Sequence, residues 1–298
     1  MLSIDLKGFA ERIRECNTGL EELPTLTPFF VCGVEVGKLK PGFVKVLQRF
    51  ADVFQTVGPV GPSGRVEVAA SLTTTEQRSA AVAAVLAQLR AEGVISGWRD
   101  ELYPVVSAFT DEPVLLVERA AATHFGIKAY GVHVNGYVKK EDGLHIWVAR
   151  RSMTKANWPG KLDHLVAGGQ PHGLSPCANV VKECGEEAGV GESLAWTAVP
   201  VGAVSYLTIS NTGYKPDVLF CYDLLLPEDF VPKAMDGEVE SFQLWPVSRV
   251  AEVVSTTTEF KTNCCLVIID FLIRHGQISP SAPGYLQLVS GLRTGQCS

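Results

Sequence analysis

Residues 168–190, GGQPHGLSPCANVVKECGEEAGV, decide how this chain is interpreted, and we call them the glutamate segment. Ser175 is a suitable N-cap, Pro176 suits the first helical position, and Gly189 suits the left-handed residue that follows a helix. The pattern therefore predicts a helix from about 176 to 188. A glycine-rich loop that precedes such a helix lets backbone groups approach a metal or a phosphate closely.

The predicted helix has one apolar face, which we expect to be buried. At 100° per residue this face comprises Cys177, Val180, Val181, Cys184 and Ala188. Glu183 and Glu187 are four residues apart and lie together along one edge of the face, whereas Glu186 points further toward solvent.

The three glutamates are unfavourable for an isolated helix. Like charges at i,i+4 repel by a few tenths of a kcal/mol, and acids in the last turn oppose the helix dipole by about 0.3–1 kcal/mol. Only Lys182 offsets these terms. A divalent cation would reverse the repulsion, because oxygen ligands that converge from one helical edge suit Mg²⁺ or Mn²⁺. A solvated acidic helix end is the simpler alternative.

The glutamate segment resembles the Nudix box, whose common form is G-x5-E-x7-R-E-U-x-E-E-x-G-U with U aliphatic. The resemblance is carried by Gly168, Lys182, Glu183, Cys184, Glu186, Glu187, Gly189 and Val190. Leu174 replaces the first glutamate of the box, and Lys182 replaces its arginine. In the family these two residues brace the loop against the helix, so the replacements imply that the brace is lost and that Leu174 packs instead.

The resemblance extends from about residue 28 to 290 and points to one Nudix subfamily. It is carried by stretches such as GWRDELYPV (97–105), YGVHVNGYV (130–138) and KPDVLFCYDLLLPEDFVP (215–232). Members of this subfamily have an extra N-terminal domain. They occur fused to thiamin pyrophosphokinase in fungi and as free-standing proteins in plants.

The fold class implied by the resemblance is α/β (α+β). It is a Nudix fold, a mixed sheet sandwiched between helices, preceded by a smaller α+β domain. A change of sequence texture near 126–130 places the boundary, which gives an N-terminal domain of residues 1–128 and a Nudix domain of residues 129–298.

The resemblance also implies metal-dependent hydrolysis of a diphosphate. Glu183 and Glu187 would be the main metal ligands, Glu186 a second or water-mediated ligand, and a carbonyl near Gly168 a further one. The stretch DGEVES offers Glu238 and Glu240 as a general base or a further ligand, and their spacing of two places both on one side of a strand. Each of these two glutamates is equally well a surface acid without a role in catalysis.

Several residues near the glutamate segment are candidates for substrate contact. The cations are Arg150, Arg151, Lys155 and Lys161, of which we expect at least one to bind phosphate. His172 lies in the loop and either touches substrate or merely packs. Trp158 is a candidate aromatic shelf for a cationic heterocycle. Arg99 either forms an ion pair with Asp100 or Glu101 or helps to close over the substrate.

Three functions stay open. The first is hydrolysis of thiamin diphosphate, or of its oxidised or deaminated analogues, to the monophosphate, which would be metabolite repair. The second is hydrolysis of a nucleoside-diphosphate-linked compound of the ADP-ribose or NADH type. The third is a non-catalytic module that binds a metabolite. In each case the expected partner is a small-molecule diphosphate, and a homodimer is kept open as an assembly.

Composition narrows the class of protein. The chain has 298 residues, 46% of them hydrophobic, a formal net charge of −6 and no dense Lys/Arg run. A nucleic-acid scaffold is excluded, because phosphate contacts require a basic face. No apolar stretch approaches the roughly 18 residues of a membrane span, and no signal or transit peptide is recognisable, so we expect a cytoplasmic protein. The eight cysteines form no CxxC pair, which indicates buried thiols and neither a zinc site nor a disulfide framework.

The remaining pattern predicts mixed secondary structure. Helices are expected at 3–15, at 73–93 with a capping box of Thr73 and Glu76, at 117–126 and at 259–276. Strands are expected at 29–36, at 130–138 and 144–150 around a turn at 139–143, and at 196–208 and 217–226.

Overall fold

The computed structural model describes residues 5–295. Its helices are α1 (Lys7–Cys16), α2 (Pro41–Leu47), α3 (Thr75–Ala91), α4 (Ala122–Phe125), α5 (Pro176–Ala188), α6 (Glu192–Ala195), α7 (Val247–Thr256), α8 (Thr262–Arg274) and α9 (Tyr285–Gly291). Its strands are β1 (Thr27–Val31), β2 (Val34–Leu39), β3 (Phe54–Val57), β4 (Arg65–Val68), β5 (Leu102–Val105), β6 (Leu115–Glu118), β7 (Ala129–Lys140), β8 (Gly143–Arg151), β9 (Leu162–Asp163), β10 (Val166–Gly169), β11 (Val199–Ile209), β12 (Tyr214–Leu225) and β13 (Val239–Pro246).

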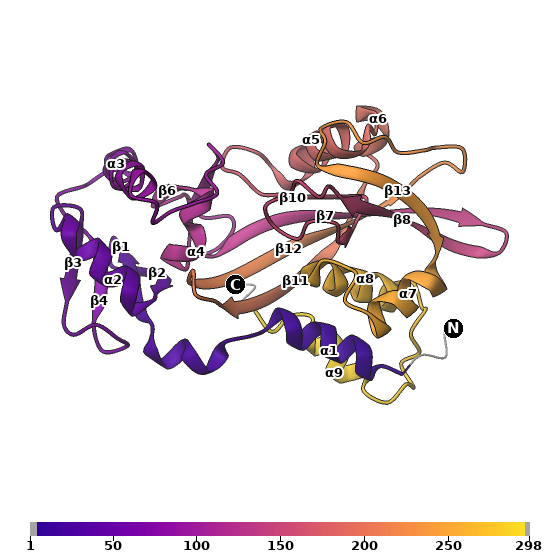
Figure 1. The fold of residues 1–298 in the computed structure, drawn as a ribbon, viewed down its shortest axis with the longest axis horizontal. Coiled ribbons are helices and arrows are strands. Elements are labelled where there is room, and N and C mark those ends of the chain that lie inside the picture. Colours follow the sequence, from indigo (N-terminus) through magenta and orange to yellow (C-terminus); the bar gives the residue numbers. More distant parts are fainter. Residues whose placement is uncertain (1–4, 296–298) are drawn as a thin grey trace.

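A mixed sheet forms the centre of the C-terminal part. Its main strand order is β11-β12-β7-β8-β13, with β10 added beside β7 and β9 beside β8. The β12–β7 pair is parallel and the neighbouring pairs are antiparallel. Helices α5 and α6 cover one face, and α7, α8 and α9 cover the other (Figure 1). The predicted mixed sheet between helices is confirmed, and so is the predicted hairpin over 130–150, which is β7–β8.

The two faces of this sheet are buried for different reasons. On the lower face, α8 is apolar nearly all round and is buried over most of its length between the sheet and α1 and α7. On the upper face, α5 is amphipathic and buries one stripe, which includes Val180 and Cys184. One side of α5 is therefore free to line a site.

The N-terminal domain is a smaller α+β unit. It contains a sheet with strand order β2-β1-β4-β3 and a separate hairpin, β5–β6, on which α3 packs. Phe29, Phe54 and Phe125 meet at its centre, with ring centroids 5.0–6.3 Å apart. The stretch 29–36, expected to be one strand, belongs to a hairpin of β1 and β2. Cys32 and Gly33 both have positive φ angles, 52° and 76°, which is the conformation of a tight hairpin turn.

Two predicted helices differ at their ends. The N-cap of α3 is Thr74, which forms a capping box with Gln77, so the expected pair Thr73 and Glu76 is displaced by one residue. The helix expected at 117–126 is interrupted: β6 runs to Glu118, and a 3-10 turn (Arg119–Ala121) precedes α4. The cause of this second difference is pairing, because β6 hydrogen-bonds to β5 along its length.

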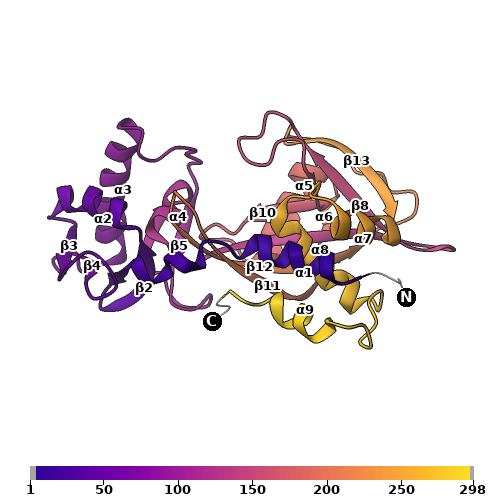
Figure 2. The same ribbon diagram turned by 60° about the horizontal axis from the view of Figure 1, so that its bottom comes forward.

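Helix α1 belongs to the core of the C-terminal domain, although the sequence assigned residues 1–128 to the N-terminal domain. It packs against α7, α8 and α9 (Figure 2). Phe9 is fully buried in the same cluster as α8. Arg12 Nη1 donates to the Thr257 carbonyl oxygen at 2.9 Å. The domain division stays a prediction, and the packing of α1 shows only that its apolar stripe covers a face that α7 and α8 would otherwise expose.

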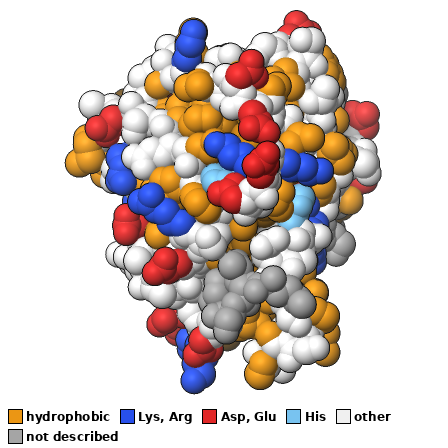
Figure 3. All heavy atoms as spheres, turned by 90° about the vertical axis from the view of Figure 1, so that its right-hand side faces the viewer, with side chains coloured by type: hydrophobic (Ala, Val, Ile, Leu, Met, Phe, Trp, Pro, Cys, Tyr) orange, Lys and Arg blue, Asp and Glu red, His pale blue; other side chains and the backbone are white. Residues whose placement is uncertain are grey.

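None of the helices within residues 5–295 combines the length and the hydropathy that a spanning segment requires. Figure 3 views the end at which the β7–β8 hairpin projects, and there acidic and basic side chains lie interspersed among hydrophobic ones. A face of this kind does not have the basic character that phosphate backbones require.

Candidate active site

Helix α5 has the predicted bounds, Pro176–Ala188. Ser175 Oγ accepts a hydrogen bond from the Ala178 amide at 3.2 Å, and Gly189 follows in the left-handed conformation with φ 64°. The buried face is turned slightly from the expected one. Cys177 is exposed, and Asn179 is buried in its place.

Buried amides hold the loop before α5 against the helix. Asn179 Nδ2 donates to the Gly169 carbonyl at 2.8 Å and to Gln170 Oε1 at 3.2 Å. Gln170 Nε2 in turn donates to the Leu174 carbonyl at 2.7 Å. We call Gln170 and Asn179 the amide brace. Leu174 is 37% exposed, so the expectation that it packs in place of a charged brace is wrong. The amide brace already fixes the loop, and burial of Leu174 is not needed.

Glu183 and Glu187 lie on the side of α5 that faces a large cavity. Glu187 Oε2 accepts a hydrogen bond from the Ala167 amide of β10 at 3.0 Å. Burial raises the pKa of Glu187 to about 8 and also raises the pKa of Glu183. A cation between these two half-buried carboxyl groups would favour their charged forms.

Gly168 makes room for one of these acids. A Cβ atom on residue 168 would lie 2.4 Å from the Glu183 carboxyl carbon. The missing side chain therefore leaves the space that the Glu183 carboxylate occupies, with the β10 backbone next to it. Glu186 is placed differently: its side chain is 53% exposed and paired with Lys182 at 2.8 Å. Within residues 5–295 the cavity lining includes Glu183 and Glu187 and does not include Glu186.

A second acidic stretch meets Glu187 across the cavity. Glu187, Asp236 and Glu238 each offer a carboxylate oxygen, and these oxygens lie within 4.8 Å of one another. Asp236 Oδ1 also accepts a hydrogen bond from the Glu238 amide at 2.8 Å, which orders the turn. Sequence reasoning missed Asp236, although it opens the DGEVES stretch two residues before Glu238.

Glu240 is not part of this group. The pairing of β13 with β8 shifts register between Val239 and Ser241, so the simple alternation that would place Glu238 and Glu240 on one side is broken. Glu240 is exposed and lies outside the lining formed by the described residues. The expected pairing of these two glutamates is therefore wrong.

The donor set suits a hard divalent cation. Every converging ligand atom is a carboxylate oxygen, and the half-buried acid Glu187 accepts only one hydrogen bond from the described chain. Mg²⁺ and Mn²⁺ prefer oxygen ligands of this kind. The residues that are present thus fit the metal that the sequence predicts.

The cavity has a volume of about 1240 Å³ and is walled by both domains. Its titratable and aromatic lining comprises Asp100, Glu101, Glu183, Glu187, Asp217 and Glu238; Arg99, Arg119, Arg151, Lys155, Lys215 and Lys261; and Tyr103, Tyr130, His133 and Trp158. Negative groups gather at α5 and before β13, and cations surround them. This is the arrangement that a metal-bound polyphosphate requires.

Two of the four predicted cations line the cavity. Lys155 forms an ion pair with Glu238. Arg151 pairs with Asp163 at 2.7 Å and donates to the carbonyls of Asn157 at 3.0 Å and Trp158 at 3.1 Å. Arg151 therefore also fixes the loop that carries Trp158, which is 45% exposed at the cavity wall.

Three other predicted contact residues lie elsewhere. Arg150 donates to the Gly160 carbonyl at 2.8 Å, and Lys161 donates to the Thr258 carbonyl. His172 is exposed, and its amide donates to the Leu102 carbonyl at 2.9 Å. In the part of the chain that the structure describes, none of the three lines the cavity. Arg150 follows the strand alternation of β8, which turns it away from Arg151.

The N-terminal domain reaches the glutamate segment directly. A Cβ atom on Gly169 would lie 1.9 Å from Tyr103 Oη and 3.0 Å from Arg119 Cζ. Glu101 forms an ion pair with Arg119 at 2.8 Å, whereas the sequence analysis offered Arg99 as its possible partner. Burial alone would lower the pKa of Arg119, but Tyr103, Glu101 and Glu183 raise it overall. Sequence reasoning missed Tyr103 and Arg119, because nothing in their own stretch marks them.

Comparison with known proteins gives consistent relatives. A family model described as "Domain of unknown function (DUF4743)" matches residues 8–129. "Nudix hydrolase 24, chloroplastic" and "Nudix hydrolase 20, chloroplastic", both from Arabidopsis thaliana, are 51% and 50% identical, and each alignment covers 99% of this chain and 80% of the relative. Among solved structures, the NUDIX domain of Shewanella oneidensis NrtR complexed with ADP ribose is 14% identical, with a TM-score of 0.41; the match covers 51% of this chain and 90% of that one.

Proposed function

Because this chain belongs to the Nudix hydrolases, a family of diphosphohydrolases, we propose that it hydrolyses thiamin diphosphate, or its oxidised or deaminated analogues, to the monophosphate. The observation that carries the hydrolytic part is the convergence of Glu187, Asp236 and Glu238, of which Glu187 and Glu238 line a large cavity. The thiamin part rests on the subfamily resemblance and on the cavity chemistry. The exposed face of Trp158 suits a cationic heterocycle.

The acids would hold Mg²⁺ or Mn²⁺, with Glu187, Asp236 and Glu238 as ligands and Glu183 beside them. When bound, the metal supplies positive charge that neutralises the diphosphate oxygens. The cations Arg119, Lys155 and Lys261 then orient the phosphates, since phosphoryl transfer depends mainly on positioning and charge neutralisation.

Among the acids, Glu183 is the better general base. Burial acts to raise the pKa of Glu238, but the hydrogen bond and the charge of Lys155 lower it overall. The pKa of Glu183 is raised, chiefly by burial. A base works best when its pKa lies near the working pH. We therefore assign Glu238, whose carboxylate converges with those of Glu187 and Asp236, to metal binding, and Glu183, which lines the cavity outside that group, to the proton of the attacking water.

A nucleoside-diphosphate-linked substrate, of the ADP-ribose or NADH type, is the second candidate. The observation that favours it is size. The cavity volume of about 1240 Å³ exceeds the range of roughly 300–1,000 Å³ that is usual for small-molecule sites. Such a volume has room for a second ring system.

The test is a hydrolysis screen with the full chain and Mg²⁺ or Mn²⁺. Thiamin diphosphate, its oxo and oxy analogues, ADP-ribose and NADH would be compared, with Glu187→Gln as the inactive variant and the exposed Glu252→Gln as its matched control. Turnover of the thiamin series that is lost only in Glu187→Gln would support the proposal. A preference for ADP-ribose or NADH would overturn the thiamin assignment and keep the metal site. Metal binding without turnover of any compound would favour a non-catalytic module.

Location and assembly stay predictions. The chloroplast appears in the names of the Arabidopsis proteins and is a statement about them. We retain the cytoplasm for this chain, to be tested by imaging a tagged protein. The homodimer that the sequence left open is tested by light scattering of the purified chain.

A further inference from the structure

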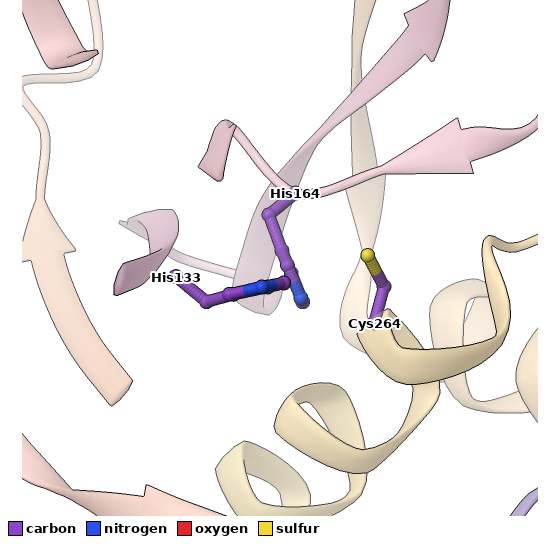
Figure 4. A group of neighbouring side chains, drawn as sticks. All are labelled: His133, His164 and Cys264. Carbon is purple, nitrogen blue, oxygen red and sulfur yellow. The ribbon is translucent and has the colours of Figure 1, made fainter. Parts of the chain in front are cut away.

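Three residues that the sequence left unrelated meet beneath the cavity. His133 lies on β7, His164 lies between β9 and β10, and Cys264 lies in the first turn of α8 (Figure 4). Each offers a ligand atom, and these atoms lie within 4.8 Å of one another. The side chains are 3%, 3% and 0% exposed. The absence of a CxxC pair had indicated no zinc site, because a spacing rule cannot detect ligands that are 31 and 100 residues apart in the chain (164 − 133 and 264 − 164).

Both imidazole rings lack partners at buried atoms. His133 Nδ1 and His164 Nε2 are buried, and neither has a hydrogen-bond partner among residues 5–295. A buried polar atom without a partner costs about 1–3 kcal/mol, and such atoms call for an explanation, a missing ion being one. Two of them on adjacent rings, with centroids 5.0 Å apart, indicate a ligand that both would share.

The protonation states suit such a ligand. Burial lowers the pKa of His133 well below its usual value, and burial lowers the pKa of His164 to about 4. Both rings are therefore neutral at physiological pH, which is the form that binds metals. Lys261 lowers the pKa of both rings and Asp163 raises it, so these charges partly cancel and a cation that enters here needs a further attraction.

Cys264 supplies that attraction. Its Sγ donates to Asp163 Oδ1 at 2.7 Å, and burial together with Asp163 raises its pKa, so the free site holds a thiol. The other Asp163 oxygen is held by Arg151 at 2.7 Å and by Lys261 at 3.5 Å. Loss of the thiol proton would leave Asp163 with both of its cations. Cys264 also lies in the first turn of α8, where the helix dipole favours a thiolate.

We propose that His133, His164 and Cys264 bind one borderline transition-metal ion of the Zn²⁺ class, at a site separate from the carboxylate site. Two imidazole nitrogens and one thiolate are ligands that Zn²⁺ accepts, whereas Mg²⁺ prefers the oxygens of the other site. On binding, the thiol proton is released to solvent and a sulfur–metal bond forms. Three protein ligands leave a fourth position open, on the side of the cavity that His133 borders.

The ion would connect the two sites mechanically. In the β7–β10 ladder His133 lies opposite Ala167, whose amide donates to Glu187. An ion at this site would fix β7, the turn that carries His164, and α8 relative to one another. It would thereby hold the backbone that supports Glu187.

The experiment uses the purified full chain in excess Mg²⁺, which keeps the carboxylate site filled. Co²⁺ is titrated as a spectroscopic substitute, and Zn²⁺ is then titrated by calorimetry and by competition. We expect one Co²⁺ per chain with a thiolate-to-metal charge-transfer band. Cys264→Ser should abolish the band and weaken Zn²⁺ binding by at least about 10-fold, because a lost ligand costs no less than a lost supporting partner. Cys265→Ser is the matched control, since this buried thiol is the next residue of α8, and it should keep the band and the affinity.

Two results would overturn the proposal. One is a natively folded wild-type chain that shows no charge-transfer band. The other is a band that persists in Cys264→Ser, which would assign it to another thiol such as the exposed Cys32 or Cys177. His164→Gln is a second variant in case Cys264→Ser does not fold. It should lose the rise in Tm that Zn²⁺ gives the wild type, and the buried His145→Gln should retain it; equal rises in both would also contradict the site.

Discussion

At the scale of single residues, Glu187 has a pKa that the folded chain sets far from its solution value. Burial raises this pKa from 4.5 to about 8 in the metal-free protein. Between these values the folded state keeps a proton that the unfolded state releases. The contribution of Glu187 to stability is therefore greatest below about pH 4.5, decreases as the pH rises to about 8, and is constant above it.

We accordingly predict that the metal-free protein gains stability relative to Glu187→Gln as the pH is lowered from about 8 to about 4.5. Above this window the variant should be the more stable of the two, because it buries no charge. Thermal unfolding of both proteins in a chelator, over a range of pH, measures the difference. A difference in Tm that does not change with pH would contradict the raised pKa. Added Mg²⁺ should remove most of the dependence in the wild type.

The second prediction separates the acids before β13. Asp236→Asn and Glu238→Gln should each weaken Mg²⁺ binding and lower kcat by at least about 10-fold, which is typical of removing a group that supports a metal. Glu240→Gln, two residues further on, should behave as the wild type because Glu240 lies at the register shift of β13, is exposed and is not among the described residues that line the cavity. Calorimetric Mg²⁺ titrations with initial rates check both. Equal losses in all three variants would show that the bulge does not divide them.

These residues also show what sequence can predict at this scale. The helical period places Glu183 and Glu187 together, because spacing along one helix is local information. Glu240 was misplaced, because the register shift of β13 depends on its pairing with β8. Arg119 was missed for the same kind of reason: its contact with Gly169 exists only after two domains meet.

At the scale of elements, the amide brace replaces an ion pair by neutral hydrogen bonds. Asn179 and Gln170 are both buried, and their amides hold the backbone of the loop that leads to α5. The capping residues of α5 were readable from sequence, since caps are local. The brace was not, because a buried asparagine in a helix looks like any other polar residue until its partners are known.

We predict that Asn179→Ala lowers the free energy of unfolding by about 1–3 kcal/mol, since it removes the hydrogen bonds that the Gly169 carbonyl and Gln170 Oε1 accept from Asn179. It should also lower kcat, because the loop positions Gly168 and Gly169 beside the acids. Ser175→Ala is the control, as loss of an N-cap costs about 1 kcal/mol and leaves the brace intact. Urea unfolding and initial rates measure both effects. An Asn179→Ala protein with full activity would show that the brace has no role in the site.

At the scale of the whole molecule, α1 and α9, the first and last helices of the described residues, share one core. Helix α1 packs with α7, α8 and α9 at one end of the molecule (Figure 1). Along the sequence, the N-terminal domain comes after α1 and before the strands of the central sheet. Periodicity predicted the helix, with Leu6, Phe9 and Ile13 on one face. It could not predict which domain that face would join, because an apolar stripe does not specify its partner.

The fourth prediction tests this placement. Phe9→Ala should destabilise the C-terminal domain by about 3–5 kcal/mol, the usual cost of truncating a buried phenylalanine. Hydrogen exchange of the α8 amides, measured alongside urea unfolding, localises the loss. Lys7→Ala, on the exposed side of α1, is the control. If exchange of α8 is unchanged in Phe9→Ala, α1 does not belong to this core.

A fragment of residues 129–298 should likewise fold poorly unless α1 is supplied.

The position of α1 has a consequence for synthesis on the ribosome. The hydrogen bond from Arg12 to Thr257 joins residues 245 apart, so α1 emerges long before its partners have been translated. At a translation rate of about 5–20 residues per second, the apolar face of α1 stays without its partners for roughly 12–50 s. During that interval the N-terminal domain, whose contacts are close in the sequence, has time to fold. For most of its synthesis the nascent chain therefore exposes the apolar face of α1. We expect a chaperone to bind this face until α7 and α8 have been translated.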